Sequence, residues 1–221
     1  MLARDFMSDV IPALKTSDTG GRALSWMETF RVSHLPIVND KEFLGLISDS
    51  DIYDLGMIDE PIGNHKLSLF SPYVYSGQHI YDVIKIISRL KLTVVPVLDE
   101  NKNYTGLIGQ SDLLAHFATL AAVRDPGGLI VLEMNHHDYS ISQIAQIVEG
   151  NNAKILSLYV TNTDQSTQME VTIKVNKTDI TSIIKTFERY SYNIKASFMD
   201  DENLDTFYRN RYEQFMRYLN I

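Results

Sequence analysis

A seven-residue segment occurs twice in the chain. Gly45–Asp51 reads Gly-Leu-Ile-Ser-Asp-Ser-Asp, and Gly106–Asp112 reads Gly-Leu-Ile-Gly-Gln-Ser-Asp. An apolar stretch with a central proline precedes each copy, with Pro36 in the first and Pro96 in the second. The prolines recur at a spacing of 60 and the motifs at 61, which indicates two copies of a supersecondary unit that buries little surface alone. We therefore expect the chain upstream of about residue 125 to fold as a pair with a shared core.

The hydrophobic pattern predicts one order of elements in both copies: an extended start, a helix, a strand, a turn, a second strand and a further helix. In the first copy these are expected at residues 10–16, 23–30, 34–38, 39–42, 43–47 and from about 51. In the second copy the first five are expected at residues 72–75, 80–87, 94–98, 99–102 and 104–108. Two such units can pack their sheets around a pseudo-twofold axis.

The pattern changes after the Pro-Gly-Gly boundary within residues 124–128. Four strands and two helices are expected there, at residues 129–134, 141–148, 155–161, 169–175, 180–187 and 194–198. This βαββαβ order is the ferredoxin-like arrangement, a four-stranded antiparallel sheet with helices on one face. Apolar residues at helical spacing over 203–221 predict a terminal amphipathic helix. That helix is expected to dock on its own chain, on a second subunit or on a regulatory target.

Composition narrows the classes of function. The net charge is −8 and neither half of the chain is basic, so no nucleic-acid partner is expected. No apolar run approaches the roughly 18 residues of a membrane helix, and the first residues lack the apolar core of a signal peptide, so no membrane association is expected. The absence of cysteine excludes disulfides and thiolate metal sites, and it fits a cytoplasmic protein.

The repeated motif carries groups that suit a nucleoside. A glycine ends a strand tightly, and the next turn opens a helix whose free N–H groups favour phosphate. The Asp51 carboxylate can accept hydrogen bonds from both hydroxyls of a ribose, and the Ser48 hydroxyl three residues earlier adds a third contact. The same spacing also fits a helix capping box, which needs no ligand. The sequence leaves both interpretations of this pair open.

The doubled unit, with its apolar-Pro-apolar strand and its Gly-x-x-(Ser/Thr)-x-x-Asp ending, resembles a tandem pair of cystathionine-β-synthase (CBS) domains, or Bateman module. The C-terminal βαββαβ segment resembles an ACT domain, and the order is similar to that of acetoin-utilisation-type regulatory proteins. The resemblance implies a sensor without catalytic activity that binds an adenine nucleotide or S-adenosylmethionine in a cleft between the repeats.

The resemblance also implies which residues contact such a ligand in the first copy. Ser33 and His34 occupy the family's position for polar contacts just before the proline strand, and Leu46 and Ser50 flank the same pocket. His34 is expected either to face a phosphate or to be a surface residue. Thr16, at the end of the first strand, is expected to reach the adenine edge.

The second copy lacks part of this set. Thr93 and Val94 stand where Ser33 and His34 stand in the first copy, and Gly109 has no hydroxyl, while Ser111 and Asp112 are retained. We therefore predict one competent site and one weak or empty site per chain.

The remaining motifs favour no other chemistry. Residues 136–138, His-His-Asp, have metal-ligand types, but adjacent side chains at a strand end diverge, so no metal site is expected. The loop 135–140 lacks the glycine that lets an amino acid approach the backbone in ACT domains, which favours an interface role. No nucleophile-elbow, Walker, dinucleotide-binding or zinc-protease spacing occurs, so no catalytic residues are assigned.

These observations predict an α+β, α/β chain of four parts: CBS repeats at 1–60 and 61–125, an ACT-like domain at 126–200 and a helix at 201–221. The predicted protein is a homodimeric regulator that binds AMP, ADP, ATP or S-adenosylmethionine and requires no cofactor. One alternative is a structural or protein-interaction module with a vestigial nucleotide pocket. A third interpretation is an enzyme that acts on the bound nucleotide.

Overall fold

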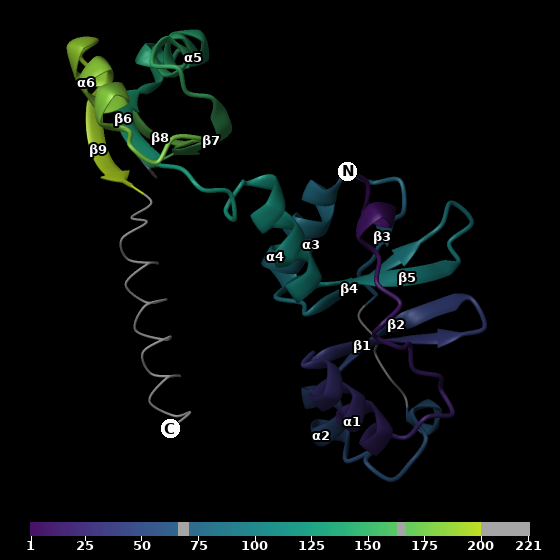
Figure 1. The fold of residues 1–221 in the computed structure, drawn as a ribbon. Helices are drawn as coiled ribbons and strands as arrows, with labels where there is room; N and C mark the ends of the chain where they lie inside the picture. Colours follow the sequence, from purple (N-terminus) through teal and green to yellow (C-terminus); the bar gives the residue numbers. More distant parts are fainter. Residues whose placement is uncertain (66–70, 163–166, 200–221) are drawn as a thin grey trace, which may run out of the picture. The chain divides into compact units, whose positions relative to one another are not determined.

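The computed structural model describes residues 1–65, 71–162 and 167–199 of the chain. It divides into two units, Met1–Phe117 and Ala118–Ile221, each with its own hydrophobic core. Figure 1 shows the elements of both. The terminal helix expected at 201–221 lies outside the described residues. No helix among the described ranges is long and apolar enough to cross a membrane.

The first unit contains both copies of the repeat. The first copy forms η1 (Ala3–Phe6), α1 (Gly20–Phe30), β1 (His34–Asn39), β2 (Glu42–Ser48), α2 (Asp49–Leu55) and η2 (Ile62–Asn64). The second copy forms β3 (Val74–Tyr75), α3 (Ile80–Leu90), β4 (Val94–Leu98), β5 (Tyr104–Gly109) and α4 (Gln110–Leu120). These elements confirm the predicted mixture of helices and strands in each copy.

The two copies have matching strand registers. His34 pairs with Ser48 across the antiparallel pair β1–β2, and Val94 pairs with Gly109 across β4–β5. Both pairs shift register one residue after the proline, opposite Gly45 and Gly106, whose φ angles are 154° and 156°. Backbone of this kind strongly favours glycine, which explains why the motif begins with that residue twice.

The edge position is also repeated, as a short strand in the second copy and as a single bridge in the first. Val74 of β3 pairs in parallel with Val97, and Leu14 forms a parallel bridge with Ile37 at the equivalent place in the first copy. The β1–β2 hairpin and the β3–β4–β5 sheet lie side by side in Figure 1, joined by an antiparallel bridge between Glu42 and Asn103.

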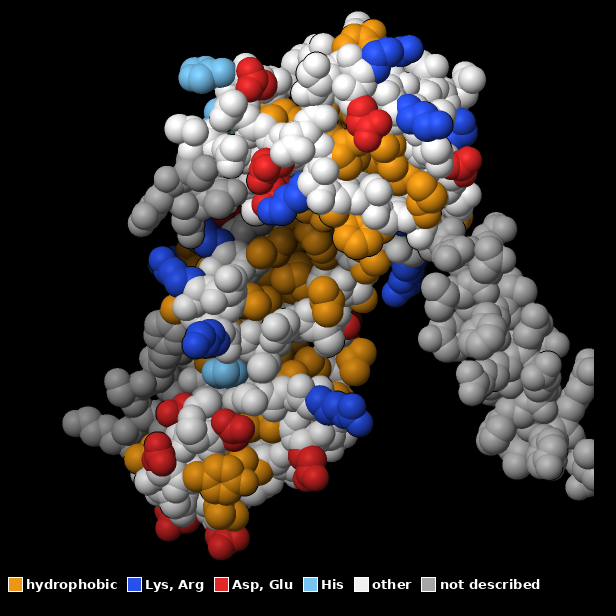
Figure 2. Space-filling view, turned by 90° about the vertical axis from the view of Figure 1, so that its left-hand side faces the viewer, with side chains coloured by type: hydrophobic (Ala, Val, Ile, Leu, Met, Phe, Trp, Pro, Cys, Tyr) orange, Lys and Arg blue, Asp and Glu red, His pale blue; other side chains and the backbone are white. Residues whose placement is uncertain are grey.

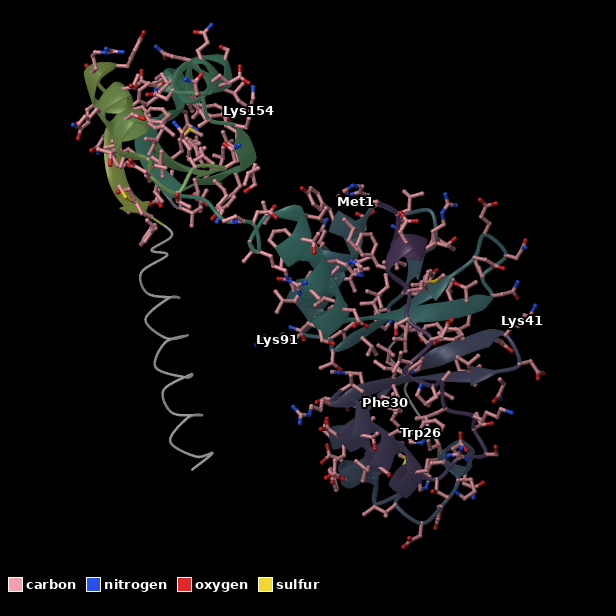
Figure 3. The ribbon with its side chains drawn as sticks, viewed as in Figure 1. Met1, Trp26, Phe30, Lys41, Lys91 and Lys154 are labelled. Carbon is pink, nitrogen blue, oxygen red and sulfur yellow. The ribbon has the colours of Figure 1, made fainter. Side chains whose placement is uncertain are left out.

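The two segments at the ends of the first copy bond to different copies. The N-terminal residues bond to the second copy, with Ala3 N–H donating to the Gln78 carbonyl at 2.8 Å. The segment after α2 returns to the first copy, where Ile62 N–H donates to the Asp18 carbonyl at 2.8 Å. One buried cluster accordingly draws its side chains from both copies. From α1, Trp26 and Phe30 pack against this cluster (Figure 3).

The second unit has the predicted βαββαβ order. Its elements are β6 (Leu129–Asn135), η3 (His136–Asp138), α5 (Ile141–Gly150), β7 (Ile155–Asn162), β8 (Gln168–Val175), α6 (Thr181–Arg189) and β9 (Asn193–Phe198). The strands follow the order β7-β8-β6-β9 with antiparallel neighbours throughout. Buried residues of α5 and α6, among them Ile144, Ile147 and Phe187, pack with the sheet in one core. The expected four-stranded antiparallel sheet is confirmed.

Candidate functional site

The repeated motif of the first copy ends in a complete helix cap. Ser48 is the N-cap of α2, and its Oγ accepts a hydrogen bond from the Asp51 backbone N–H at 3.1 Å. In return, Asp51 Oδ2 accepts from the Ser48 backbone N–H at 2.8 Å and from the Ser48 hydroxyl at 2.7 Å. The capping interpretation is therefore confirmed, because the box satisfies N–H groups that a helix start leaves without partners.

The cap leaves part of the Asp51 carboxylate available. Each hydrogen bond that this carboxylate makes with a described residue goes to Oδ2. The Asp51 side chain is exposed, and the Oδ1 atom has lone pairs for further donors. Capping and ligand binding are thus compatible at this aspartate, because Oδ2 holds the helix start and no hydrogen bond to a described residue uses Oδ1.

A residue of the second copy enters the site of the first. Thr93 Oγ1 accepts a hydrogen bond from the Ser33 backbone N–H at 3.0 Å and lies 3.1 Å from His34 Nδ1. The sequence placed Thr93 only as the counterpart of Ser33 in the second copy. Its contact with the first copy spans about 60 positions, and local pattern carries no signal for such a contact.

The electrostatics around His34 are set by burial and by two carboxylates. Partial burial lowers the pKa of His34 below its ordinary value of 6.5, because desolvation penalises the charged ring. The nearby carboxylates of Asp49 and Asp51 raise the pKa but do not overcome the burial. The imidazole is therefore mostly neutral near pH 7, and it is not an exposed surface histidine.

Two other predicted residues differ in their accessibility. Ser50 is exposed, and its Oγ lies 2.8 Å from the Ser48 Oγ, beside the cap. Leu46 is only 4% exposed and belongs to the hydrophobic core. Its side chain packs inward, behind the motif.

Thr16 lies at the other end of β1. Its backbone N–H and hydroxyl are within 3.3 Å and 3.2 Å of Asn39 Oδ1, and its carbonyl accepts from the Gly63 N–H at 2.8 Å. Asn39 is the last residue of β1 and His34 the first, which separates them by about 17 Å along an extended strand. The structure does not bring Thr16 together with the capping pair.

The second copy repeats the backbone hydrogen bond at the start of the helix but lacks the side chain that caps it. Gln110 N–H donates to the Thr93 carbonyl at 2.9 Å, as Asp49 N–H does to Ser33 at 3.2 Å. Where the first copy has the Ser48 side chain, Gly109 leaves a space, and Asp112 Oδ2 lies 3.1 Å from the point that a Cβ would occupy. Ser111 is exposed beside it. The two motifs thus share their backbone pairing and differ in side chains, with Gly109 and Gln110 in place of Ser48 and Asp49.

A hollow of about 780 Å³ lies between α1 and α2 of the first copy. Its lining includes Ser33, the acidic residues Glu28 and Asp49, the base Arg31 and exposed Tyr53. Figure 2 shows carboxylates gathered around exposed hydrophobic side chains at the end of the first unit that these helices form. The lining of this hollow therefore combines apolar side chains with two carboxylates and one guanidinium.

The second unit holds a polar hollow of about 660 Å³ where β6 ends, lined in part by His137, Asp138 and Tyr192. Burial raises the pKa of Tyr192, and the Asp138 carboxylate adds to the effect. Within the described ranges no group of histidine and carboxylate side chains is arranged to hold a metal ion.

Comparisons with known proteins bear on the first unit. A family model described as "CBS domain" matches the chain twice, over residues 3–58 and 54–119. Inosine-5'-monophosphate dehydrogenase from Methanocaldococcus jannaschii is 25% identical over 138 residues, which are 60% of this chain and 27% of that protein. The chain therefore spans only about a quarter of the length of this curated relative.

Two solved structures are similar to the chain. A CBS domain pair/ACT domain protein from Thermotoga maritima is 21% identical, with a TM-score of 0.48 over 54% of this chain and 98% of that one. A protein assigned to acetoin utilization (AcuB) from Vibrio cholerae is 20% identical, with a TM-score of 0.48 over 56% and 95%.

The two matches to the family model together cover more than half of the chain. They coincide with the two repeats that have matching strand registers. The chain belongs to the CBS domain family, with a tandem pair of CBS domains in residues 3–119.

Proposed function

We propose that this protein is a non-catalytic sensor that binds an adenosyl ligand at the motif of the first CBS repeat. The observation that carries the proposal is the Ser48–Asp51 cap, which fixes the carboxylate at the start of α2 while leaving its Oδ1 without a described partner. A pair of adjacent ribose hydroxyls suits such a carboxylate. His34 and Thr93 stand at the other side of the same β1–β2 strand end, where His34 pairs with Ser48.

Binding at this place would affect both repeats. The site contains Ser48 and Asp51 from the first repeat and Thr93 from the second, and the repeats share one core. A ligand shifts an equilibrium between two arrangements only by its difference in affinity for them. A ligand that contacts residues from both repeats loses some of these contacts when the repeats move relative to each other. Its affinity for the two arrangements then differs.

The charges favour a ligand with few negative charges. Asp49 and Asp51 both lie in the first turn of α2, and both act on His34. A triphosphate would bring more negative charge near these carboxylates than AMP or S-adenosylmethionine does, and like charges repel. We therefore expect AMP or S-adenosylmethionine to bind more tightly than ATP.

We propose that the second unit is an ACT-like domain that relays the signal in a homodimer. Its βαββαβ order and strand order support this assignment. The loop from Asn135 to Ser140 contains no glycine, so a role in subunit contact fits it better than amino-acid binding.

A thermal-shift screen of AMP, ADP, ATP, S-adenosylmethionine and NAD tests the proposal on the full chain. A ligand that binds the native state raises its stability, by about 2.7 kcal/mol when present at 100 times its Kd. AMP or S-adenosylmethionine should raise the Tm, and Asp51→Ala should abolish the shift. The absence of any shift at millimolar concentrations would contradict a sensing role.

One observation favours a second candidate, a protein-interaction module with a vestigial pocket. The first motif is fully satisfied as a cap, and the second lacks its hydroxyl at Gly109. This candidate predicts that no member of the panel shifts the Tm, so the same screen separates the two.

A further inference from the structure

The Thr93 hydroxyl joins the two repeats at the proposed site. Thr93 precedes β4 of the second repeat, and its Oγ1 contacts the Ser33 N–H at 3.0 Å and His34 Nδ1 at 3.1 Å. The Thr93 carbonyl in turn accepts from the N–H of Gln110, the first residue of α4. A single residue thus links the imidazole of the first repeat with a helix start of the second.

The donors and acceptors around Thr93 Oγ1 indicate where its hydroxyl proton goes. A threonine hydroxyl has one proton to donate and two lone pairs. The Ser33 backbone N–H occupies one lone pair, since an amide nitrogen donates only. Among the described residues, His34 Nδ1 is the other partner of Thr93 Oγ1, so the hydroxyl proton has one acceptor available, the Nδ1 lone pair. When His34 Nδ1 accepts, a neutral imidazole carries its proton on Nε2.

The charges around the ring agree with a neutral imidazole. On the β4 side the ring meets the uncharged Thr93, and on the α2 side it meets the carboxylates of Asp49 and Asp51. Burial lowers the pKa of His34 despite these two carboxylates. A doubly protonated ring would make Nδ1 a donor to Thr93 Oγ1, and the hydroxyl proton would then have no acceptor among the described residues.

We infer that Thr93 is a positioning residue that holds His34 as the neutral tautomer with hydrogen on Nε2. The site of the first repeat then presents a neutral hydrogen-bond donor to its ligand, which suits an oxygen acceptor of a nucleoside. The part of this inference that concerns a ligand rests on the proposed function. The part that concerns the tautomer is a property of the free protein.

The tautomer is tested by two-bond ¹H–¹⁵N correlation spectra of the ¹⁵N-labelled full chain without ligand at about pH 7.5. The chain has six histidines, and His34→Gln identifies the signals of His34. We expect the Nε2–H pattern in the wild type and in Thr93→Ser, which keeps the hydroxyl. Thr93→Val keeps the shape and removes the hydroxyl, and should give a mixture of tautomers.

Thr29→Val is the matched control, because the Thr29 hydroxyl bonds only to the Ser25 carbonyl within α1. It should leave the His34 signals unchanged. An Nδ1–H or doubly protonated ring in the wild type would overturn the inference. An unchanged pattern in Thr93→Val would overturn it as well. If Thr93→Val fails to fold, Thr93→Ser decides the question. The Nε2–H pattern in both Thr93→Ser and the wild type agrees with the inference, and its loss in Thr93→Ser overturns it.

A second arm measures AMP binding to the same proteins by calorimetry. Loss of one oriented hydrogen-bond donor should weaken AMP binding by about 3- to 10-fold in Thr93→Val. Thr93→Ser should bind within about twofold of the wild type. Equal binding by Thr93→Val would overturn the positioning role. If the wild type binds no AMP, the proposed function fails, and the spectra alone decide the tautomer.

Discussion

Gly109→Ser should rebuild in the second repeat the cap that the first repeat has. The two motifs share their strand register, since Ser48 pairs with His34 as Gly109 pairs with Val94. Gly109 has no left-handed φ, so a side chain there meets no backbone strain. The new hydroxyl would stand where the Ser48 Oγ stands relative to its aspartate, within reach of the Asp112 N–H and carboxylate.

The size of the effect follows from two contributions and one cost. An N-cap hydroxyl typically contributes about 1 kcal/mol to stability. Replacement of a glycine in an unstrained conformation adds about 0.4–1 kcal/mol by restricting the unfolded chain. Against this, the added Cβ would lie 3.1 Å from Asp112 Oδ2, which is the end of a flexible side chain and can move. We expect a net gain of about 1 kcal/mol, or about 3–6 °C in Tm.

The assay is urea unfolding of the full chain followed by circular dichroism, with Gly109→Ala as the matched control. Alanine supplies the Cβ without the hydroxyl, so the difference between the two variants measures the cap. Asp112→Ala in the Gly109→Ser background should remove most of that difference. Equal stabilities for the serine and alanine variants would refute the equivalence of the two motifs.

Further predictions concern titration and packing. Because the pKa of His34 is lowered in the folded state, the unfolded state binds more protons below pH 6.5, so stability should fall as pH drops from about 7 through 6.5 to the lowered pKa. His34→Gln should flatten this part of the urea-midpoint profile, and an unchanged profile would contradict the assignment. Gly127→Ala should destabilise the second unit by about 3 kcal/mol, since a Cβ would lie 1.9 Å from the Val175 carbonyl oxygen at a φ of 149°. Phe187→Ala should cost about 3–5 kcal/mol, because that ring is fully buried. Differential scanning calorimetry would detect either loss as an earlier transition, and an unshifted transition would count against the described core.

Much of the fold could be predicted because its signals are local. The glycine and the Leu-Ile pair recur at one spacing, and the structure repeats the register shift opposite Gly45 and Gly106. Helix starts also carry local signals, since the hydroxyls of Thr19 and Ser140 cap α1 and α5. The order of strands and helices in the second unit followed from its hydrophobic pattern.

The site was less predictable because its contacts are not local. The sequence could pair Ser48 with Asp51, three residues apart, but it gave no signal that Thr93 would bond to Ser33 and His34. It placed Thr16 at the adenine edge of a ligand, but it gave no signal that Thr16 would bond to Asn39, at the end of β1 opposite His34. Such placements depend on how the two repeats pack, which no periodicity encodes.

The central claim is that one of the two CBS motifs in each chain is a competent ligand site. Calorimetric titration with AMP tests it most directly, on the wild type, Asp51→Ala and Asp112→Ala, each checked for native circular dichroism. The account predicts one site per chain, abolished by Asp51→Ala and changed less than about twofold by Asp112→Ala. Two equal sites per chain, or unaltered binding by Asp51→Ala, would contradict it.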